Sequence, residues 1–258
     1  AKEVVREFIE DYLAAAERAA LDLERRLTRP DGGLFRTARA GKAHLDAYLE
    51  DYAYLGDAAI DLYEASGDEA HLVRALALCE RLIADFGSEE GAFYATAHGH
   101  ETLIARARDG QDDALPNANA VAAQLCARLS HYVDRADLRQ VAERALQRFA
   151  EPMPRAPRAL QSALAVLDFL SRGSIELALV GDAGDPRTQA IVREISGVYL
   201  PNRLLGRKAS ATESALPLLR DKRARNGAPS LYICRDFACE APLTEPEDVR
   251  SSLARQIT

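Results

Sequence analysis

Hydrophobic residues recur at helical spacing through the first two thirds of the chain. The clearest pattern covers residues 2–28, where apolar side chains repeat every three or four positions opposite a densely charged face. Five more helices are predicted, over residues 45–65, 69–85, 117–132, 136–151 and 157–171. The first, third and fifth helices are amphipathic, whereas the others are nearly uncharged or apolar on more than one face. This alternation predicts helical hairpins arranged in an outer and an inner layer.

Two glycine-containing turns interrupt the helices in a similar way. The segment Gly32–Thr37 follows the first helix and ends in a short extended piece. The segment Gly91–Thr96 has the same order of residues: small residues first, then an aromatic residue, then a threonine at the end. Each turn follows an amphipathic helix and precedes a more apolar one. The pattern predicts an internal repeat of about 60 residues made of helix, turn and helix.

After Gly173 the pattern changes to short apolar runs that alternate with helices. The predicted elements are a strand over 175–180, a helix over 186–197, an apolar run over 202–205, a short helix ending near 219, a strand over 231–234 and a helix over 245–257. We therefore expect a mainly α fold: a partial ring of helical hairpins over residues 1–172, followed by a small, mostly parallel α/β module over 173–258 that packs on it.

Composition excludes several classes of protein. The chain has 258 residues, a net charge of −7, 48% hydrophobic and 28% charged residues. The negative charge disfavours nucleic acid, and no run approaches the roughly 18 apolar residues of a membrane span. We find no secretory signal, and four cysteines do not make a disulfide framework, so a reducing, cytoplasmic location is expected. The first residue, Ala1, is not Met, which indicates a fragment of something longer.

Six short motifs, in one order, resemble a known family. They are Asp31–Leu34, Glu50–Ala53, Leu62–Asp68, Gly91–Thr96, Asp112–Asn119 and Tyr232–Cys239. Together they resemble the spermatogenesis-associated family that carries an N-terminal thioredoxin-like domain. The resemblance implies an (α/α)6 toroid similar to that of N-acylglucosamine 2-epimerases and six-hairpin glycosidases. It also implies that this chain holds about half of the toroid and its terminal module, without the thioredoxin-like domain, and it assigns no activity.

One motif departs from the family pattern. Residues 116–120 read Pro-Asn-Ala-Asn-Ala, whereas the family tends to have Pro-Ser-Gly-Asn-Ser. Both hydroxyl groups and the glycine are missing. If these groups shape a ligand pocket in relatives, that pocket is altered here.

A polar stretch without periodicity, Glu101–Ala120, is the first candidate site. Such stretches at the mouth of a helix often carry binding residues. Arg106 and Arg108 suit an anionic or hydroxyl-rich ligand. Asp113 is a candidate catalytic carboxylate.

Two asparagines in the same stretch have alternative roles. Asn117 and Asn119 form a hydrogen-bonding cluster with Asp113 in the ligand-binding interpretation. In the structural interpretation, Asp113 and Asn117 cap the helix over 117–132, and Pro116 lies in its first turn. The sequence leaves both open.

Acidic residues open the helix over 45–65. Glu50 and Asp51, with Tyr52, would bind sugar hydroxyls or act as general acid or base. Alternatively, the two acids complement the helix dipole and pair with Arg106 or Arg108. The structural alternative is favoured, and the functional one is kept as a candidate.

Histidine and cysteine pairs carry weaker signals. His98 and His100 resemble half a metal site, but a solvated turn is favoured because no third ligand is defined and no metal is expected. Cys234 and Cys239 are a candidate redox pair or half a metal site, but structural thiols that lie close in space are favoured, because the spacing is not C-x-x-C and no second cysteine pair completes a zinc site. The segment 181–184 lacks the dinucleotide and P-loop patterns, so no cofactor is expected.

Three functions remain open. The chain binds or converts a sugar-like or anionic ligand, or it is a non-catalytic scaffold for a thioredoxin-domain protein, or it performs thiol redox chemistry. Half a toroid exposes the inner apolar faces of its helices, which predicts self-association or a missing partner half. The sequence does not indicate which reaction, if any, takes place.

Overall fold

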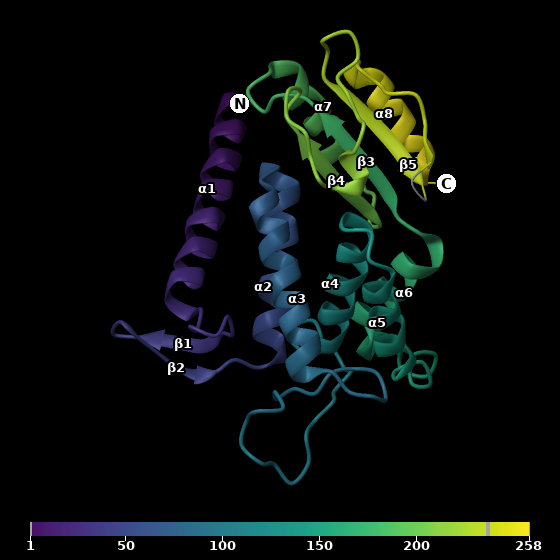
Figure 1. Cartoon of the computed structure of the whole chain (residues 1–258). Coiled ribbons are helices and arrows are strands. Elements are labelled where there is room, and N and C mark those ends of the chain that lie inside the picture. Colours follow the sequence, from purple (N-terminus) through teal and green to yellow (C-terminus); the bar gives the residue numbers. More distant parts are fainter. Residues whose placement is uncertain (1, 236–237, 258) are drawn as a thin grey trace. The chain divides into compact units, whose positions relative to one another are not determined.

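The computed structural model describes residues 2–235 and 238–257, and these form a mainly α fold with an α/β part (Figure 1). The chain divides into two compact units. Unit 1 comprises residues 1–130 and 135–166, and unit 2 comprises residues 131–134 and 167–258. Within the described residues, no helix has both the length and the apolar character that a bilayer crossing requires.

Unit 1 is helical apart from one small hairpin. Its elements are α1 (Lys2–Leu27), β1 (Phe35–Arg39), β2 (Lys42–Asp46), α2 (Leu49–Ser66), α3 (Glu69–Phe86), α4 (Ala118–Tyr132), α5 (Ala136–Gln147), the 3-10 helix η1 (Pro157–Ala159) and α6 (Gln161–Arg172), the last residues of α4 and α6 belonging to unit 2. Helices α2 and α3 lie side by side as a hairpin (Figure 1). Asp68 makes this connection sharp, because its side chain accepts a hydrogen bond from the backbone N–H of Ala70 and caps α3.

The predicted start of the second helix, at residue 45, was wrong. Residues 42–46 form strand β2, which pairs in antiparallel fashion with β1, and α2 begins only at Leu49. The two strands are joined by Ala40 and Gly41, both at positive φ, which is typical of two-residue hairpin turns. The helix predicted over 157–171 is likewise divided into η1 and α6.

The two turns of the predicted repeat match in the structure, although a β-hairpin follows the first and a long loop follows the second. Thr28 bridges Leu34 after α1, and Gly87 bridges Phe93 after α3, so the two bridges close turns of equal length. Gly32 occupies the left-handed region in the first turn, with φ 82°, and Gly91 does so in the second, with φ 78°. A side chain other than glycine would be strained there.

Each repeated turn is anchored by the helix that follows it. The backbone N–H of Leu34 donates to the hydroxyl of Tyr52 in α2, at 2.8 Å. The equivalent N–H of Phe93 donates to the side-chain oxygen of Asn119 in α4, at 2.6 Å. Tyr52 and Asn119 therefore have equivalent places in the repeat.

The helices predicted to form the inner layer, α2, α4 and α6, do not expose the apolar faces expected of a broken ring. Among the described residues of α2, α4 and α6, only Leu167 is a large exposed hydrophobic side chain. The core instead encloses side chains such as Ile60, Tyr63 and Phe86, all fully buried. The apolar surface on which the expected self-association rested is therefore not found in these helices.

Unit 2 is built on a four-stranded sheet. Its elements are β3 (Ile175–Val180), α7 (Pro186–Ser196), β4 (Arg203–Lys208), the 3-10 helix η2 (Pro217–Leu219), β5 (Ser230–Arg235), β6 (Ala238–Cys239), α8 (Pro246–Ala254) and the 3-10 helix η3 (Arg255–Ile257). The strand order is β4-β3-β5-β6, and only β3 and β4 run parallel. The expectation of a mostly parallel sheet was therefore wrong, and the sheet is mixed.

One face of this sheet packs against both long helices of the unit. Leu177 and Leu179 of β3 share a buried cluster with Ile191 of α7 and Leu253 of α8. Because side chains alternate along a strand, these residues lie on one face. Strand β3 is buried along its whole length, as is expected for a central strand covered on both sides.

Candidate functional site

A small polar cavity in unit 1 is the candidate site, and we call it the Arg–Asp pocket. It has a volume of about 140 Å³. It is lined by Arg29, Leu34, Asp46, Ala47, Tyr52, Arg81, Asp85, Phe86, Ala97, Gly99 and His100. These residues come from the turn after α1, from β2, α2 and α3, and from the long loop before α4.

The first repeated turn places Arg29 at the pocket. The backbone N–H of Arg29 donates to the carbonyl of Gly33 at 2.8 Å, and that of Gly32 donates to the carbonyl of Arg29 at 3.0 Å. Asp31 lies at the tip of this turn and accepts a hydrogen bond from the N–H of Gly33. That bond, together with Arg81, lowers the pKa of Asp31 below its ordinary value, although burial opposes the shift.

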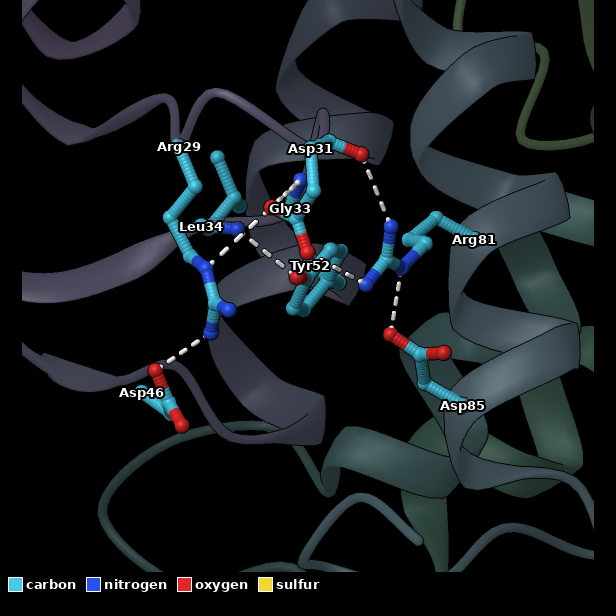
Figure 2. Close-up of polar contacts among 8 residues, drawn as sticks. All are labelled: Arg29, Asp31, Gly33, Leu34, Asp46, Tyr52, Arg81 and Asp85. Atoms are coloured by element: carbon cyan, nitrogen blue, oxygen red, sulfur yellow. Dashed lines mark hydrogen bonds and ion pairs between the residues drawn. The ribbon is translucent and has the colours of Figure 1, made fainter. Parts of the chain in front are cut away.

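Arg29 connects the turn to strand β2. Its guanidinium group bonds Asp46, the last residue of β2, and contacts Asp31 at 3.2 Å (Figure 2). The three side chains are partly exposed, so the pairing contributes more to their orientation than to stability.

Arg81 and Asp85 form the α3 side of the pocket. They lie four residues apart on the helix and are hydrogen-bonded to each other. Arg81 also donates to the backbone carbonyl of Asp31 at 3.0 Å and to its carboxylate at 3.2 Å (Figure 2). The hydrogen bond to Asp85 raises the pKa of Arg81, so its positive charge is permanent.

Aromatic rings form the apolar side. Tyr52 is buried, packs against Phe86 with ring centres 5.3 Å apart, and has its pKa raised by that burial. The ring of His100 meets Tyr48 and Phe86 edge-on, at 5.5 and 6.4 Å. The pocket thus combines an aromatic wall with charged groups.

The charges in the lining are balanced. Two guanidinium groups and two carboxylates face the cavity. A carboxylate has about four acceptor sites and a guanidinium five donor N–H groups, so each keeps capacity beyond its ion pair. Such a lining can donate to and accept from a neutral, hydroxyl-bearing ligand. The described residues contain no group of three or more side chains placed to hold a metal ion.

The predicted carboxylates of α2 lie outside this pocket lining. Arg36 of β1 binds Glu50 at 2.6 Å and Asp51 at 2.9 Å. Asp51 also accepts the backbone N–H of Tyr48, and burial raises its pKa in spite of these contacts. The expected pairing with Arg106 or Arg108 was wrong, because Arg36 on the neighbouring hairpin reaches both acids.

The two predicted arginines hold their own loop. Arg106 and Arg108 both lie over the ring of Tyr94, with distances of 3.9 and 4.8 Å to its centre. Arg106 also bonds Thr96, and Arg108 pairs with Glu90 at 2.7 Å. Neither lines the pocket, although Tyr52 from the same set of candidates does.

Asn117 caps α4 as predicted, whereas the role predicted for Asp113 belongs to its neighbour Asp112. The side chain of Asn117 accepts the backbone N–H of Asn119 at 2.9 Å, as expected of a helix cap. Asp113 is exposed, and its backbone N–H donates to the carbonyl of Leu115 at 3.2 Å. Asp112 instead accepts from the backbone of Asn117 at 2.7 Å and of Ser162 at 2.9 Å, and so joins the starts of α4 and α6.

Two further corrections concern this region. Pro116 precedes the cap residue and lies outside α4, not in its first turn. Asn119 is buried and bonds the backbone of Phe93 and Asp109, so it closes the loop and does not face the pocket.

The cysteine pair at the end of the chain is oxidised. Cys234 and Cys239 occupy paired positions on β5 and β6 and form a disulfide with Cα atoms 4.0 Å apart. The two cysteines thus lie close together, but as a disulfide and not as the structural thiols of the favoured interpretation. Asp236 and Phe237 of the same motif lie outside the described residues. Cys79 and Cys126 are free and fully buried, with sulfur atoms 3.5 Å apart.

The four charged pocket residues escaped the sequence analysis: Arg29, Asp46, Arg81 and Asp85. They come from three separate segments of the chain, and each is unremarkable in its own segment. The available signal was the repeated turn, which the pocket adjoins, together with the Arg81–Asp85 spacing on α3.

Comparison with known proteins identifies relatives that match about four fifths of this chain. No family model matches the chain. Spermatogenesis-associated protein 20 of Homo sapiens is 32% identical over 212 residues, which are 80% of this chain and 27% of that protein. Its counterpart in Mus musculus is 30% identical over the same shares. An uncharacterised protein of Caenorhabditis elegans is 25% identical over 204 residues, 79% of this chain and 28% of that protein. The chain thus spans about a quarter of the length of these relatives, and the resemblance based on the six motifs is confirmed.

Proposed function

Because the chain is a relative of spermatogenesis-associated protein 20 over four fifths of its own length, we propose that it is part of an (α/α) toroid that binds a small sugar-like ligand in the Arg–Asp pocket. In this proposal residues 1–172 form the hairpin part and residues 173–258 the α/β module. The names of the relatives carry no ligand or activity, so the argument rests on the pocket.

The balanced lining is the observation that carries the proposal. A monosaccharide presents hydroxyl groups that both donate and accept, and C–H faces that pack on aromatic rings. Arg29 and Arg81 supply donors, Asp46 and Asp85 supply acceptors, and Phe86 supplies an apolar wall. Free anions fit less well, because two carboxylates line the same cavity.

A thermal-shift panel tests the proposal. The probes are D-glucose, D-mannose and N-acetyl-D-glucosamine, with inorganic phosphate and sulfate as the anionic arm. A ligand that binds only the folded chain raises the free energy of unfolding by about 2.7 kcal/mol at a concentration 100 times its Kd. We expect at least one monosaccharide to raise the Tm and neither anion to do so.

A matched pair of variants locates the binding. Asp46→Ala removes an exposed pocket carboxylate, and Arg29 keeps its contact with Asp31. Asp137→Ala removes a similarly exposed carboxylate that pairs with Arg135, and neither residue lines the pocket. Both substitutions are expected to cost less than about 1 kcal/mol, but only Asp46→Ala is expected to abolish the monosaccharide shift. A panel without any shift, or a shift that survives in Asp46→Ala, contradicts the proposal and favours the non-catalytic scaffold.

Thiol redox chemistry is a second candidate, favoured by the Cys234–Cys239 disulfide and by the exposure of Cys239. An external dithiol would supply two electrons and two protons, leave as a disulfide and release both cysteines as thiols. Equilibration in glutathione buffers, followed by alkylation and mass measurement, tests this. We expect two cysteines to become alkylated together while Cys79 and Cys126 stay protected. Reduction that requires denaturant would identify a purely structural bond.

A further inference from the structure

The two ring nitrogens of His100 distinguish this residue from the rest of the pocket lining, while its backbone N–H donates to the carbonyl of Ala97. Among the described residues, the charged groups of the pocket are paired: Arg29 with Asp46, and Arg81 with Asp85. For the ring nitrogens of His100, the described part of the chain provides no hydrogen-bond partner. Among the ring–ring contacts of the described residues, His100 meets Tyr48 and Phe86 edge-on.

His98 provides an internal comparison two residues earlier. One of its ring nitrogens lies 3.1 Å from the carbonyl oxygen of Gly87, and the other lies 3.1 Å from the guanidinium of Arg106. Both nitrogens of His98 are therefore used to hold the loop. The two histidines of the His-Gly-His sequence therefore differ in their contacts, and residues 98 and 99 form an exposed turn, as the favoured interpretation predicted.

His100 belongs to the lining of the pocket. Gly99 and His100 both line the cavity, and His100 is only partly exposed. Two aromatic neighbours limit the movement of the ring, so a contact with a ligand would require little reordering of the side chain. An imidazole nitrogen can donate to or accept from a hydroxyl group, depending on the tautomer.

We propose that His100 directly contacts the bound ligand through a hydrogen bond between a ring nitrogen and a sugar hydroxyl. The proposal rests on the sugar-binding function proposed above and assigns the contact residue within that site. It goes beyond the ion pairs, because His100 is held in place by ring packing and keeps its hydrogen-bonding capacity for the ligand.

Replacement by phenylalanine separates this role from ring packing. His100→Phe keeps an aromatic ring beside Tyr48 and Phe86 and removes both nitrogens. We expect the Kd for the monosaccharides of the panel to rise about tenfold, as for the loss of one hydrogen bond, with the Tm of the unliganded protein unchanged. His71→Phe is the matched control, because His71 is a partly buried histidine of α3 outside the pocket lining, and it should leave the Kd unchanged.

Histidine ring signals in NMR give a direct readout of contact. The chain has five histidines, so the His71 and His100 signals can be assigned from the two variants. On titration of the unmodified protein with D-glucose, D-mannose or N-acetyl-D-glucosamine, the His100 signal is expected to move and the His71 signal to stay. A His100 signal that stays fixed at saturation, or a His100→Phe protein that binds as tightly as the unmodified one, overturns the inference and leaves the proposed function standing. Absence of monosaccharide binding to the unmodified protein overturns both.

Discussion

Replacing Arg128 with leucine is expected to reduce the free energy of unfolding of unit 1 by about 3–5 kcal/mol at neutral pH. Arg128 lies in α4 with its side chain only 10% exposed, and it binds three carboxylates of α2. The distances are 2.7 Å to Asp57, 2.7 Å to Asp61 and 3.2 Å to Glu64. Removing the arginine leaves these negative charges together without that counter-ion, and repulsion adds to the cost of burial.

The loss is expected to shrink as the pH falls. Burial raises the pKa of Asp57 above 3.8, and Arg128 opposes this shift. Without Arg128 the pKa of Asp57 in the folded state rises further. A carboxyl group with a raised folded pKa stabilises the fold in its protonated form, below its ordinary pKa, and this contribution is lost as the pH rises through the folded value. Acid therefore relieves the variant more than the unmodified protein.

Urea denaturation at about pH 7 and about pH 4 measures both effects. Arg135→Leu is the matched control, because Arg135 also pairs with two acids, Glu80 and Asp137, but on an exposed surface. We expect that variant to lose no more than about 1 kcal/mol. Combining Arg128→Leu with Asp57→Asn should recover part of the loss at neutral pH. Equal losses in Arg128→Leu and Arg135→Leu would show that the α2–α4 charge cluster does not hold the helices together.

The repeat and most helices could be predicted because their signals are local. A glycine at positive φ, an aromatic residue and a helical period each depend on neighbouring residues, as in the turn around Gly32. Strand direction is not local. The runs 175–180 and 231–234 were recognised as strands, but nothing in a short apolar run indicates whether its neighbour runs parallel or antiparallel, so the mixed sheet of unit 2 was missed.

The candidate pocket could not be predicted because its ion pairs connect distant segments. Arg81 reaches Asp31, fifty residues earlier, and Arg29 reaches Asp46 across the hairpin. Meanwhile the most polar stretch of the sequence drew attention to residues that fix the loop itself, such as Arg106 over Tyr94. Polarity without periodicity marks a loop correctly, yet a loop of this length needs many polar contacts for its own backbone.

Replacing Asn119 with alanine is the second change expected to have a large effect, about 3–4 kcal/mol of lost stability. Asn119 is buried, accepts the N–H of Phe93 at 2.6 Å, and donates to the carbonyls of Phe93 at 3.1 Å and of Asp109 at 3.0 Å. Alanine leaves the N–H and the carbonyl of buried Phe93 without this partner, and each unsatisfied buried group costs about 1–3 kcal/mol. The carbonyl of Asp109 belongs to an exposed residue and adds less. Urea denaturation measures the loss, and an m-value equal to that of the unmodified protein would confirm that the folded state is otherwise retained.

Tyr52, which anchors the first turn as Asn119 anchors the second, provides a reference for this loss of stability. Tyr52→Phe removes only the acceptor for the N–H of Leu34 and keeps the ring, so its expected cost is about 1–3 kcal/mol. Asn119→Asp adds a second comparison. It keeps an acceptor for Phe93 but places a carboxylate oxygen against two carbonyl oxygens, and it should be at least as harmful as alanine. If Asn119→Ala cost less than Tyr52→Phe, the second turn would have to be held by contacts other than the three bonds of Asn119. Tyr52 and Asn119 would then bond equivalent backbone groups without contributing similarly to stability.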